Sequence, residues 1–430
     1  MPSTQRLALT AASASQASLR RHNLALIYGL IARASGPLSR AQLAEAAGVT
    51  RATAGALVDR MVEARLVEEL APDTSGRAGR PARPVRLARG TFAGIGLEVN
   101  VDYLAVRGID LAGETLAERI SHVEVAGTCP AATIRALADL AAPVRRRLNA
   151  HHCRIVGTTL AVAGLVDRQT GYLRTAPNLG WRGVDLMGLA RAAGLAGELA
   201  VDNEAALAAR SELAASAERG PDFVYVSGGI GIGAGIVRGG AVARGAHGWA
   251  GELGHMTVDP AGPLCACGAT GCLERYAGRR AILAAALGPA GSAAPGEKTG
   301  TKPGATVAPA PGGAVVPGTS LDDAVRLATA RDPQALAALG NAGRALGVAL
   351  AGALNFADLG TVVLGGDFAE FAPFLIPALQ AELSRRVVSW GWSPSDQVIR
   401  VAAARHLPAL TGAGLTATDL VAANPKAYLT

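Results

Sequence analysis

The sequence predicts an α/β protein with two parts, an N-terminal winged helix-turn-helix and a larger α/β body. Three observations lead to this prediction. The first ninety residues carry helical patterns and two short strand-like runs, whereas the remainder alternates apolar strand-like runs with alanine-rich helical stretches. The first ninety residues hold thirteen arginines, no lysine and six acidic residues, whereas the rest holds 28 basic and 28 acidic residues. At 430 residues, the chain is long enough for two or three cores.

The N-terminal part should contain three helices. Residues 20–34 predict the first, because apolar residues recur there at helical spacing and Gly36-Pro37 follows. Ser39 precedes Gln42 at capping-box spacing, which predicts a short helix that Gly48 ends. Thr50 should cap the third helix, whose apolar stripe comprises Ala54, Leu57, Val58 and Met61.

Two short strands should complete this part. The runs LVEEL and PVRLA flank PDTSGRAGRPAR, a Gly- and Arg-rich segment that is typical of the wing of a winged helix. The collected basic charge favours contacts with a phosphate backbone. A basic solvated surface or tail, and a winged helix used for protein contacts, are the alternatives.

A histidine and three cysteines gather in the segment GELGHMTVDPAGPLCACGATGCLE, from Gly251 to Glu274. His255, Cys265, Cys267 and Cys272 form a complete Cys3His set, which predicts a closed structural zinc site. The glycines at 254, 262, 268 and 271 can take the positive backbone angles of a tight metal loop. The alternative is buried free thiols with an unrelated histidine. Cys129 and Cys153 stand apart and should be ordinary small apolar side chains.

The same segment resembles the signature of the ROK family, which contains sugar-responsive repressors, open reading frames and sugar kinases. Glu252, three residues before the histidine, and Glu274, two after the last cysteine, carry the resemblance, which extends from about Thr91 to the C-terminus. It implies a two-lobed, actin-like body of the ribonuclease H-like, hexokinase-type ATPase fold. We expect residues 1–19 to be flexible, 20–89 to form the winged helix-turn-helix, 91–203 the first lobe and 204–430 the second. Residues 288–320, rich in Ala, Pro, Gly and Thr, should be a disordered insertion.

The resemblance also implies a sugar pocket, with Glu252, His255 and Glu274 at the sugar hydroxyls and zinc anchoring their loop. Ionised carboxylates accept hydroxyl hydrogens strongly, which fits this role. The alternative for the glutamates is a solvated loop surface. Further sugar-binding candidates are Asn203 and Glu204 in VDNEAALAA and Asn178 in APNLGW, with Trp181 as a pocket wall. Asn203 or Asp202 would alternatively cap a helix, and Asn178 would simply serve a turn.

A nucleotide site is not expected. Family kinases have an Asp-x-Gly-x-Thr phosphate loop, whereas the matching stretch GIGLEVNVDYL places Glu98 and Asn100 at its aspartate and glycine. The kinase base is an aspartate where this chain has Glu204, and its extra methylene weakens a catalytic interpretation. The glycine-rich SGGIGIGAGIV of residues 227–237 favours a hairpin over a phosphate cradle, and VVLGGDF indicates a buried strand and a Gly-Gly turn.

The sequence therefore predicts a sugar-responsive transcriptional repressor of carbohydrate-metabolism genes and no enzymatic activity. Its partners would be double-stranded operator DNA and a monosaccharide or sugar-phosphate effector, and it would act as a homodimer or homotetramer. Alternatives are a ROK-type sugar kinase that uses ATP and a repressor controlled by a protein partner. In the ROK repressor arrangement, the third helix enters the major groove, and the candidate DNA contacts are Arg40, Thr50, Arg51, Thr53, Arg77 and Arg80.

A cytoplasmic location is expected. No apolar run should reach the roughly twenty residues that a membrane span needs, and the start of the chain lacks a charged-then-hydrophobic export pattern.

Overall fold

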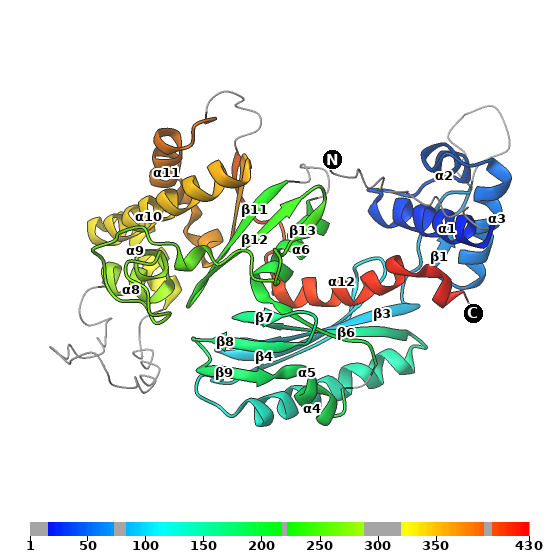
Figure 1. The fold of residues 1–430 in the computed structure, drawn as a ribbon, viewed down its shortest axis with the longest axis horizontal. Coiled ribbons are helices and arrows are strands. Elements are labelled where there is room, and N and C mark those ends of the chain that lie inside the picture. Colours follow the sequence, from blue (N-terminus) through cyan, green and yellow to red (C-terminus); the bar gives the residue numbers. More distant parts are fainter. Residues whose placement is uncertain are drawn as a thin grey trace, which may run out of the picture. The chain divides into compact units, whose positions relative to one another are not determined.

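The computed structural model describes residues 16–72, 83–195, 197–216, 222–287, 320–390 and 398–429. The chain forms two compact units, one of Met1–Phe92 with Asp419–Thr430 and one of Ala93–Thr418 (Figure 1). The predictions of a loose N-terminus and of an insertion after residue 287 fall almost entirely outside the described residues. There are two exceptions. Residues 16–19 belong to the first helix, α1 (Gln16–Arg33), so the expected loose N-terminus was extended too far. The side chain of Ser320 caps the following helix, α9 (Leu321–Thr329), in a capping box.

The smaller unit begins with three helices, α1 (Gln16–Arg33), α2 (Arg40–Ala47) and α3 (Arg51–Glu63). The predicted caps are confirmed. Ser39 and Gln42 form the capping box of α2, which ends at Gly48 with φ 62°, and Thr50 accepts the N–H of Thr53 at the start of α3. The predicted stripe of α3 is buried against the other two helices. Local capping chemistry thus sets the limits of both short helices.

Two short strands follow, β1 (Val67–Glu69) and β2 (Val85–Leu87), paired antiparallel. They correspond to the two predicted strand-like runs. The segment between them, residues 73–82, lies outside the described residues, and with it Arg77 and Arg80. The same unit includes the C-terminal 3-10 helix η4 (Pro425–Tyr428), where the ring of Tyr428 meets that of Phe92 edge to face.

The first lobe of the larger unit is built on a five-stranded sheet in the order β10-β6-β3-β4-β5. Its strands are β3 (Phe92–Val99), β4 (Tyr103–Asp110), β5 (Thr115–His122), β6 (Arg154–Val162) and β10 (Leu199–Asn203). A smaller sheet consists of β7 (Leu165–Asp167), β8 (Tyr172–Ala176) and β9 (Trp181–Asp185), followed by α5 (Leu186–Ala192). Helix α4 (Pro130–Ala150) packs on β4 and β5.

Helix α12 (Pro408–Ala423) covers the opposite face of this sheet from α4 (Figure 1). Its close approach depends on two glycines of β3. A Cβ added to Gly94 would lie 2.3 Å from the carbonyl oxygen of Gly414, and one added to Gly96 would lie 2.3 Å from that of Leu410. The expectation that residues 204–430 form the second lobe therefore needs correction, because the sequence-distant α12 packs on the first-lobe sheet.

The second lobe has a five-stranded sheet in the order β13-β12-β11-β14-β15. Its strands are β11 (Phe223–Gly228), β12 (Ile232–Arg238), β13 (Ala241–Ala243), β14 (Thr361–Gly366) and β15 (Val398–Val401). Strands β11 and β12 are antiparallel, so the glycine-rich stretch is the predicted hairpin. Strand β14 feeds the predicted Gly-Gly turn, in which Gly366 has φ 57°. Helix α6 (Glu204–Ala215) packs on β11 and β12.

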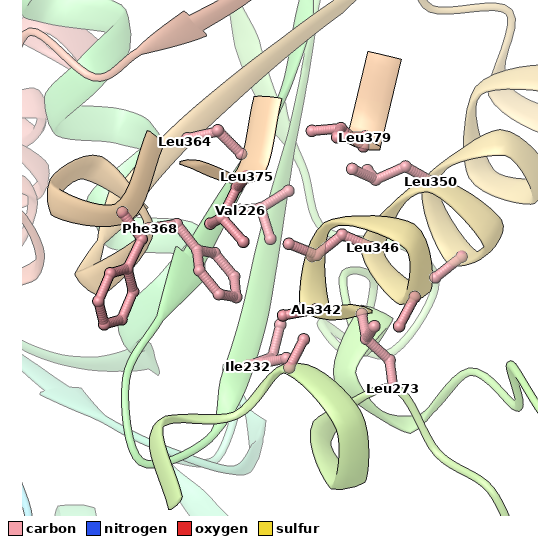
Figure 2. Close-up of a cluster of buried hydrophobic side chains, with 14 of the residues drawn as sticks. Val226, Ile232, Leu273, Ala342, Leu346, Leu350, Leu364, Phe368, Leu375 and Leu379 are labelled. Carbon is pink, nitrogen blue, oxygen red and sulfur yellow. The ribbon is translucent and has the colours of Figure 1, made fainter. Parts of the chain in front are cut away.

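The core of this lobe lies between its sheet and the helices α10 (Pro333–Ala357) and α11 (Asp367–Arg386). Figure 2 shows Val226 and Leu364 of the sheet facing Leu346 and Leu350 of α10 and Leu375 and Leu379 of α11. Helix α10 is long and apolar enough to cross a membrane, so the expectation of no such run was wrong; 56% of its most apolar stretch is buried inside the lobe. Burial in this core accounts for its composition.

Candidate functional site

The predicted cysteine and histidine ligands come together. One ligand atom from each of His255, Cys265, Cys267 and Cys272 lies within 4.8 Å of the others. The sulfur of Cys265 is 3.9 Å from Nδ1 of His255, and the sulfurs of Cys267 and Cys272 are 3.6 Å apart. Tetrahedral zinc with ordinary bond lengths separates such atoms by roughly 3.5–3.8 Å. The donor set and its spacing therefore fit a zinc ion.

Tight local turns build this cluster. The N–H of Cys265 donates to the carbonyl of Ala269, and the N–H of Gly268 donates back to that of Cys265. Gly268 and Gly271 have the predicted positive φ, 96° and 69°. Gly254 and Gly262 do not, and they serve close packing instead. A Cβ on Gly254 would lie 2.3 Å from the carbonyl oxygen of Ile232, and one on Gly262 would lie 2.1 Å from the Tyr276 hydroxyl.

Two thiols of the cluster, those of Cys272 and Cys265, have a raised pKa. Burial first, and then the neighbouring thiols, raise the pKa of Cys272 to about 12. Burial also raises the pKa of Cys265. Thiolates crowded in this way are stabilised by a divalent cation, which is a second sign that the cluster suits a metal. Of the two solitary cysteines, Cys153 is buried as expected, whereas Cys129 is exposed.

His255 also links this cluster to the candidate sugar residues. It ends the 3-10 helix η2 (Leu253–His255), and its Nε2 lies 3.9 Å from Oε2 of Glu252. Glu274 opens the short helix α7 (Glu274–Ala277), and its Oε2 accepts the N–H of Ile232 at 3.2 Å. Burial raises the pKa of both carboxyls, and the charge of Glu274 adds to the rise at Glu252. The imidazole ring of His255 thus faces the thiol of Cys265 with Nδ1 and the carboxylate of Glu252 with Nε2.

Asn178 meets Glu274 at the β11–β12 turn. A Cβ added to Gly231 would lie 2.7 Å from both Asn178 Nδ2 and Glu274 Oε2. The first lobe therefore contributes an amide beside a second-lobe carboxylate. Trp181 does not line this site, contrary to expectation: it is 3% exposed in the first-lobe core and donates its Nε1–H to the carbonyl of Thr128 at 2.9 Å.

Asn203 is the N-cap of α6. Its Oδ1 accepts the N–H groups of Ala205 and Ala206, and its Nδ2 donates to the carbonyl of Gly164 at 3.0 Å. Asp202 is instead buried against Arg244. The capping alternative therefore holds for Asn203, whose second Nδ2 hydrogen is the donor left for a ligand.

Glu204, the first residue of α6, faces two further carboxylates. Burial first, and then the charges of Glu98 and Glu252, raise its pKa to about 7. Glu98 is 3% exposed, and its Oε1 accepts the hydroxyl of Tyr103 at 2.6 Å. Its Oε2 has no hydrogen-bond partner within the described residues. Glu98 was not predicted as a site residue, although a glutamate inside the apolar strand FAGIGLEV was the available signal.

The turn after β3 does not have the form of a phosphate loop. Asn100 Oδ1 accepts the N–H of Asp102, which closes a short side-chain turn where a phosphate loop keeps backbone N–H groups open. Across from it, Arg279 of α8 (Arg279–Leu287) lies between Asp102 and Asp367. Two carboxylates and a paired arginine therefore occupy this region.

The candidate DNA contacts differ in how exposed their side chains are and in whether they are paired within the protein. Arg51 is exposed at the start of α3. Thr50 and Thr53 bond to each other through their hydroxyls, 2.9 Å apart, in the cap of the same helix. Arg40 is paired with Asp59 and Glu69, so it stabilises the module from within. Arg60, exposed near the end of α3, was not predicted, and its place outside the apolar stripe was the signal.

Two known protein families match parts of this chain. The sequence profile of the ROK family matches residues 94–419, which include the Cys3His cluster and every candidate sugar residue. The chain belongs to the ROK family. A profile of the MarR family matches residues 29–78, which contain α2 and α3. The ROK body is therefore preceded by a helix-turn-helix, as the sequence predicted.

Similar proteins include a repressor, a sugar kinase and a transcriptional regulator. The chain is 30% identical to the xylose repressor of Bacillus subtilis, over 87% of this chain and 90% of that protein. It is 28% identical to a glucokinase of Streptomyces coelicolor, over 71% of this chain and 91% of that protein. A solved ROK family transcriptional regulator, a homolog of the Escherichia coli MLC protein, matches 96% of this chain and 99% of its own with a TM-score of 0.75 and 22% identity. That likeness supports the fold.

Proposed function

We propose that the protein is a sugar-responsive, DNA-binding transcriptional repressor of carbohydrate-metabolism genes. The observation that carries the proposal is the combination, in one chain, of a capped helix-turn-helix with Arg51 exposed and a ROK body that brings the candidate carboxylates and amides together. The similarity to the Bacillus subtilis xylose repressor extends over both parts, since it covers 87% of the chain.

The sugar would bind between Asn178 and Asn203 on one side and the second-lobe carboxylates on the other. Glu252, Glu274 and Glu204 would accept hydroxyl hydrogens, and the free Nε2 of His255 would complete the set. Because these groups come from both lobes, a bound sugar would favour one lobe arrangement. If that arrangement binds operator DNA less tightly, sugar lowers operator affinity by the same coupling factor, commonly about 1–3 kcal/mol.

A zinc ion would anchor the loop that carries Glu252, His255 and Glu274. His255, Cys265, Cys267 and Cys272 are the ligands that this proposal assigns, and a bound zinc ion would supply the positive charge that lets the crowded thiols ionise. Its role is structural, because four protein donors leave no open position.

The proposal is tested by selecting binding sites from random double-stranded DNA and measuring affinity for the selected duplex with and without a panel of monosaccharides. We expect an inverted-repeat site, consistent with a homodimer or homotetramer, and a loss of affinity with at least one sugar. Absence of sequence-specific binding would overturn the proposal. Release by a protein and by no sugar would favour the partner-controlled alternative.

A sugar kinase is the second candidate, and Glu204 is the observation that favours it. A carboxyl whose pKa lies near neutrality suits a general base, and a similar glucokinase covers 71% of the chain. The acidic turn at Glu98 and Asp102 weighs against it, because both carboxylates repel phosphate. ATP-dependent sugar phosphorylation that disappears in Glu204→Gln would establish the kinase. We therefore propose that the protein has no enzymatic activity. We also propose a cytoplasmic location.

A further inference from the structure

Arg279 is held by carboxylates from both lobes. Its Nε lies 2.6 Å from Asp367 Oδ2 and its Nη2 lies 2.8 Å from Asp367 Oδ1, a two-pronged pair within the second lobe. Its Nη1 lies 3.5 Å from Oδ2 of Asp102, in the first-lobe turn after β3. The side chain of Asp367 is 10% exposed and that of Asp102 is 50% exposed. The inner pair is therefore the strong one, and the outer contact is weak and open to solvent.

This arginine adjoins the sugar pocket through one short turn. The N–H of Arg279 donates to the carbonyl of Gly229, and the N–H of Gly229 donates to that of Gly231. Gly231 is the residue at which Asn178 and Glu274 meet. Arg279 is therefore one of the cations that a phosphate on a bound sugar could approach, and it is the one that a first-lobe carboxylate, Asp102, already covers.

The other charges around the candidate site are acidic, already paired, or exposed to solvent. Glu98 hydrogen-bonds Tyr103, the residue after Asp102, and Glu204, Glu252 and Glu274 are the proposed sugar contacts. Arg168 and Arg244 both pair with the buried Asp202. Arg275 and Arg280 are exposed on α7 and α8, and their charges partly offset the rise that burial causes in the pKa of Glu274.

We infer that the pocket selects an uncharged sugar and rejects sugar phosphates, and that Asp102 is the residue that sets this preference. A phosphate ester carries about −1.5 to −2 charges at neutral pH. To bind here it must displace Asp102 from Arg279 while lying near several carboxylates, and like charges brought together out of water repel strongly. An uncharged sugar needs only hydroxyl-to-carboxylate bonds. The inference rests on the proposed function, since it specifies the ligand of the same pocket.

The first experiment compares matched ligands by isothermal titration of the zinc-loaded, full-length protein. The probes are D-xylose, D-glucose and N-acetyl-D-glucosamine, each against its terminal phosphate ester. We expect at least one uncharged sugar to bind and its phosphate to bind at least tenfold more weakly. A phosphate that binds as tightly as its parent sugar, or more tightly, overturns the inference and leaves the sugar-responsive function intact. If no probe binds, the inference falls, whereas the proposed function is decided separately by the affinity for the selected duplex across the wider sugar panel.

The second experiment tests Asp102 itself. Asp102→Asn removes the charge and keeps the size, and since Asp102 is half-exposed and only loosely paired, the fold should persist. We expect the affinity for the phosphate ester to rise at least fivefold, with the affinity for the parent sugar changed less than twofold. Asp139→Asn, an exposed charge change on α4 of the same lobe, is the control and should alter neither. An equal response of both variants would overturn the role of Asp102.

Discussion

The Nδ1 atom of His255 lies 3.9 Å from the sulfur of Cys265. The opposite ring nitrogen lies 3.9 Å from a carboxylate oxygen of Glu252. One rigid ring therefore connects the thiol cluster with the candidate pocket, so a disturbance of the metal ligands should reach the ligand-binding groups.

Loss of one thiol should affect both sites. We expect Cys265→Ser to lower zinc affinity by at least about tenfold, because even partners outside the ligand set typically account for that much. The response of DNA binding to sugar should fall with it. Metal analysis of the purified protein and anisotropy of a labelled duplex measure the two effects. The exposed Cys129→Ser is the control, and unchanged zinc content and sugar response in Cys265→Ser would rule out the coupling.

Gly268 and Gly271, in the loop that carries the three cysteines, form a matched pair for mutagenesis. Both have positive φ, but a Cβ on Gly271 would lie 1.6 Å from the carbonyl oxygen of Asp259, whereas one on Gly268 meets nothing within 4 Å. Gly268→Ala should therefore cost only the backbone strain, about 1–2 kcal/mol. Gly271→Ala should cost more and lose zinc. Thermal unfolding and metal analysis measure the stability and the zinc content of both variants. Equal losses of stability and zinc in Gly268→Ala and Gly271→Ala would contradict the close contact of Gly271 with Asp259.

The carboxyl of Glu204 should make stability depend on pH. Its pKa rises from 4.5 to about 7 on folding, so the folded state binds the proton more tightly. The resulting stabilisation is fully present below pH 4.5 and is lost as the pH rises through 7. Glu204→Gln is uncharged throughout, so its stability relative to the native protein should increase between pH 5 and pH 8, by on the order of 3 kcal/mol at most.

Urea denaturation across that range measures the difference for Glu204→Gln. Glu124→Gln, at an exposed position of the same unit, is the control and should run parallel to the native protein. A gap between Glu204→Gln and the native protein that stays constant with pH would show that Glu204 ionises normally.

Arg51 should account for a large share of DNA affinity. We expect Arg51→Ala to weaken binding of the selected duplex by about 1–3 kcal/mol, because this exposed side chain stands at the start of α3, which we propose as the helix that reads the major groove. Arg147→Ala, an exposed arginine on α4, removes the same charge from the body. Fluorescence anisotropy at fixed salt compares them, and similar losses would mean that net charge alone governs affinity.

Local patterns were sufficient for much of the fold. Ser39, Gln42 and Thr50 define their helices through bonds within a few residues, and the hairpin at 227–237 follows from alternating glycines. Helix α12 was misplaced, because its partners Gly94 and Gly96 lie more than three hundred residues away in sequence. Contacts of that separation leave no local periodicity.

The site was predicted where spacing carried the information. The thiols and His255 share one loop, so their convergence could be read from the sequence. The positions of Arg279 and Trp181 in the fold could not be predicted from their spacing in the sequence. Trp181 belongs to a core assembled from distant elements, and the importance of Arg279 arises only when Asp102 and Asp367 approach from different lobes.

The Arg279 triad also constrains how descendants of this chain can change. Substituting Asp102 alone reduces the counter-charge of Arg279, and substituting Arg279 alone leaves the largely buried Asp367 without its two hydrogen bonds. Only the second of these steps leaves a largely buried carboxylate without its partner, so replacing Arg279 has a cost that replacing the half-exposed, loosely paired Asp102 does not have. Asp102 is therefore the position at which a single substitution can change the ligand chemistry of this lineage, whereas Arg279 and Asp367 have to be replaced together.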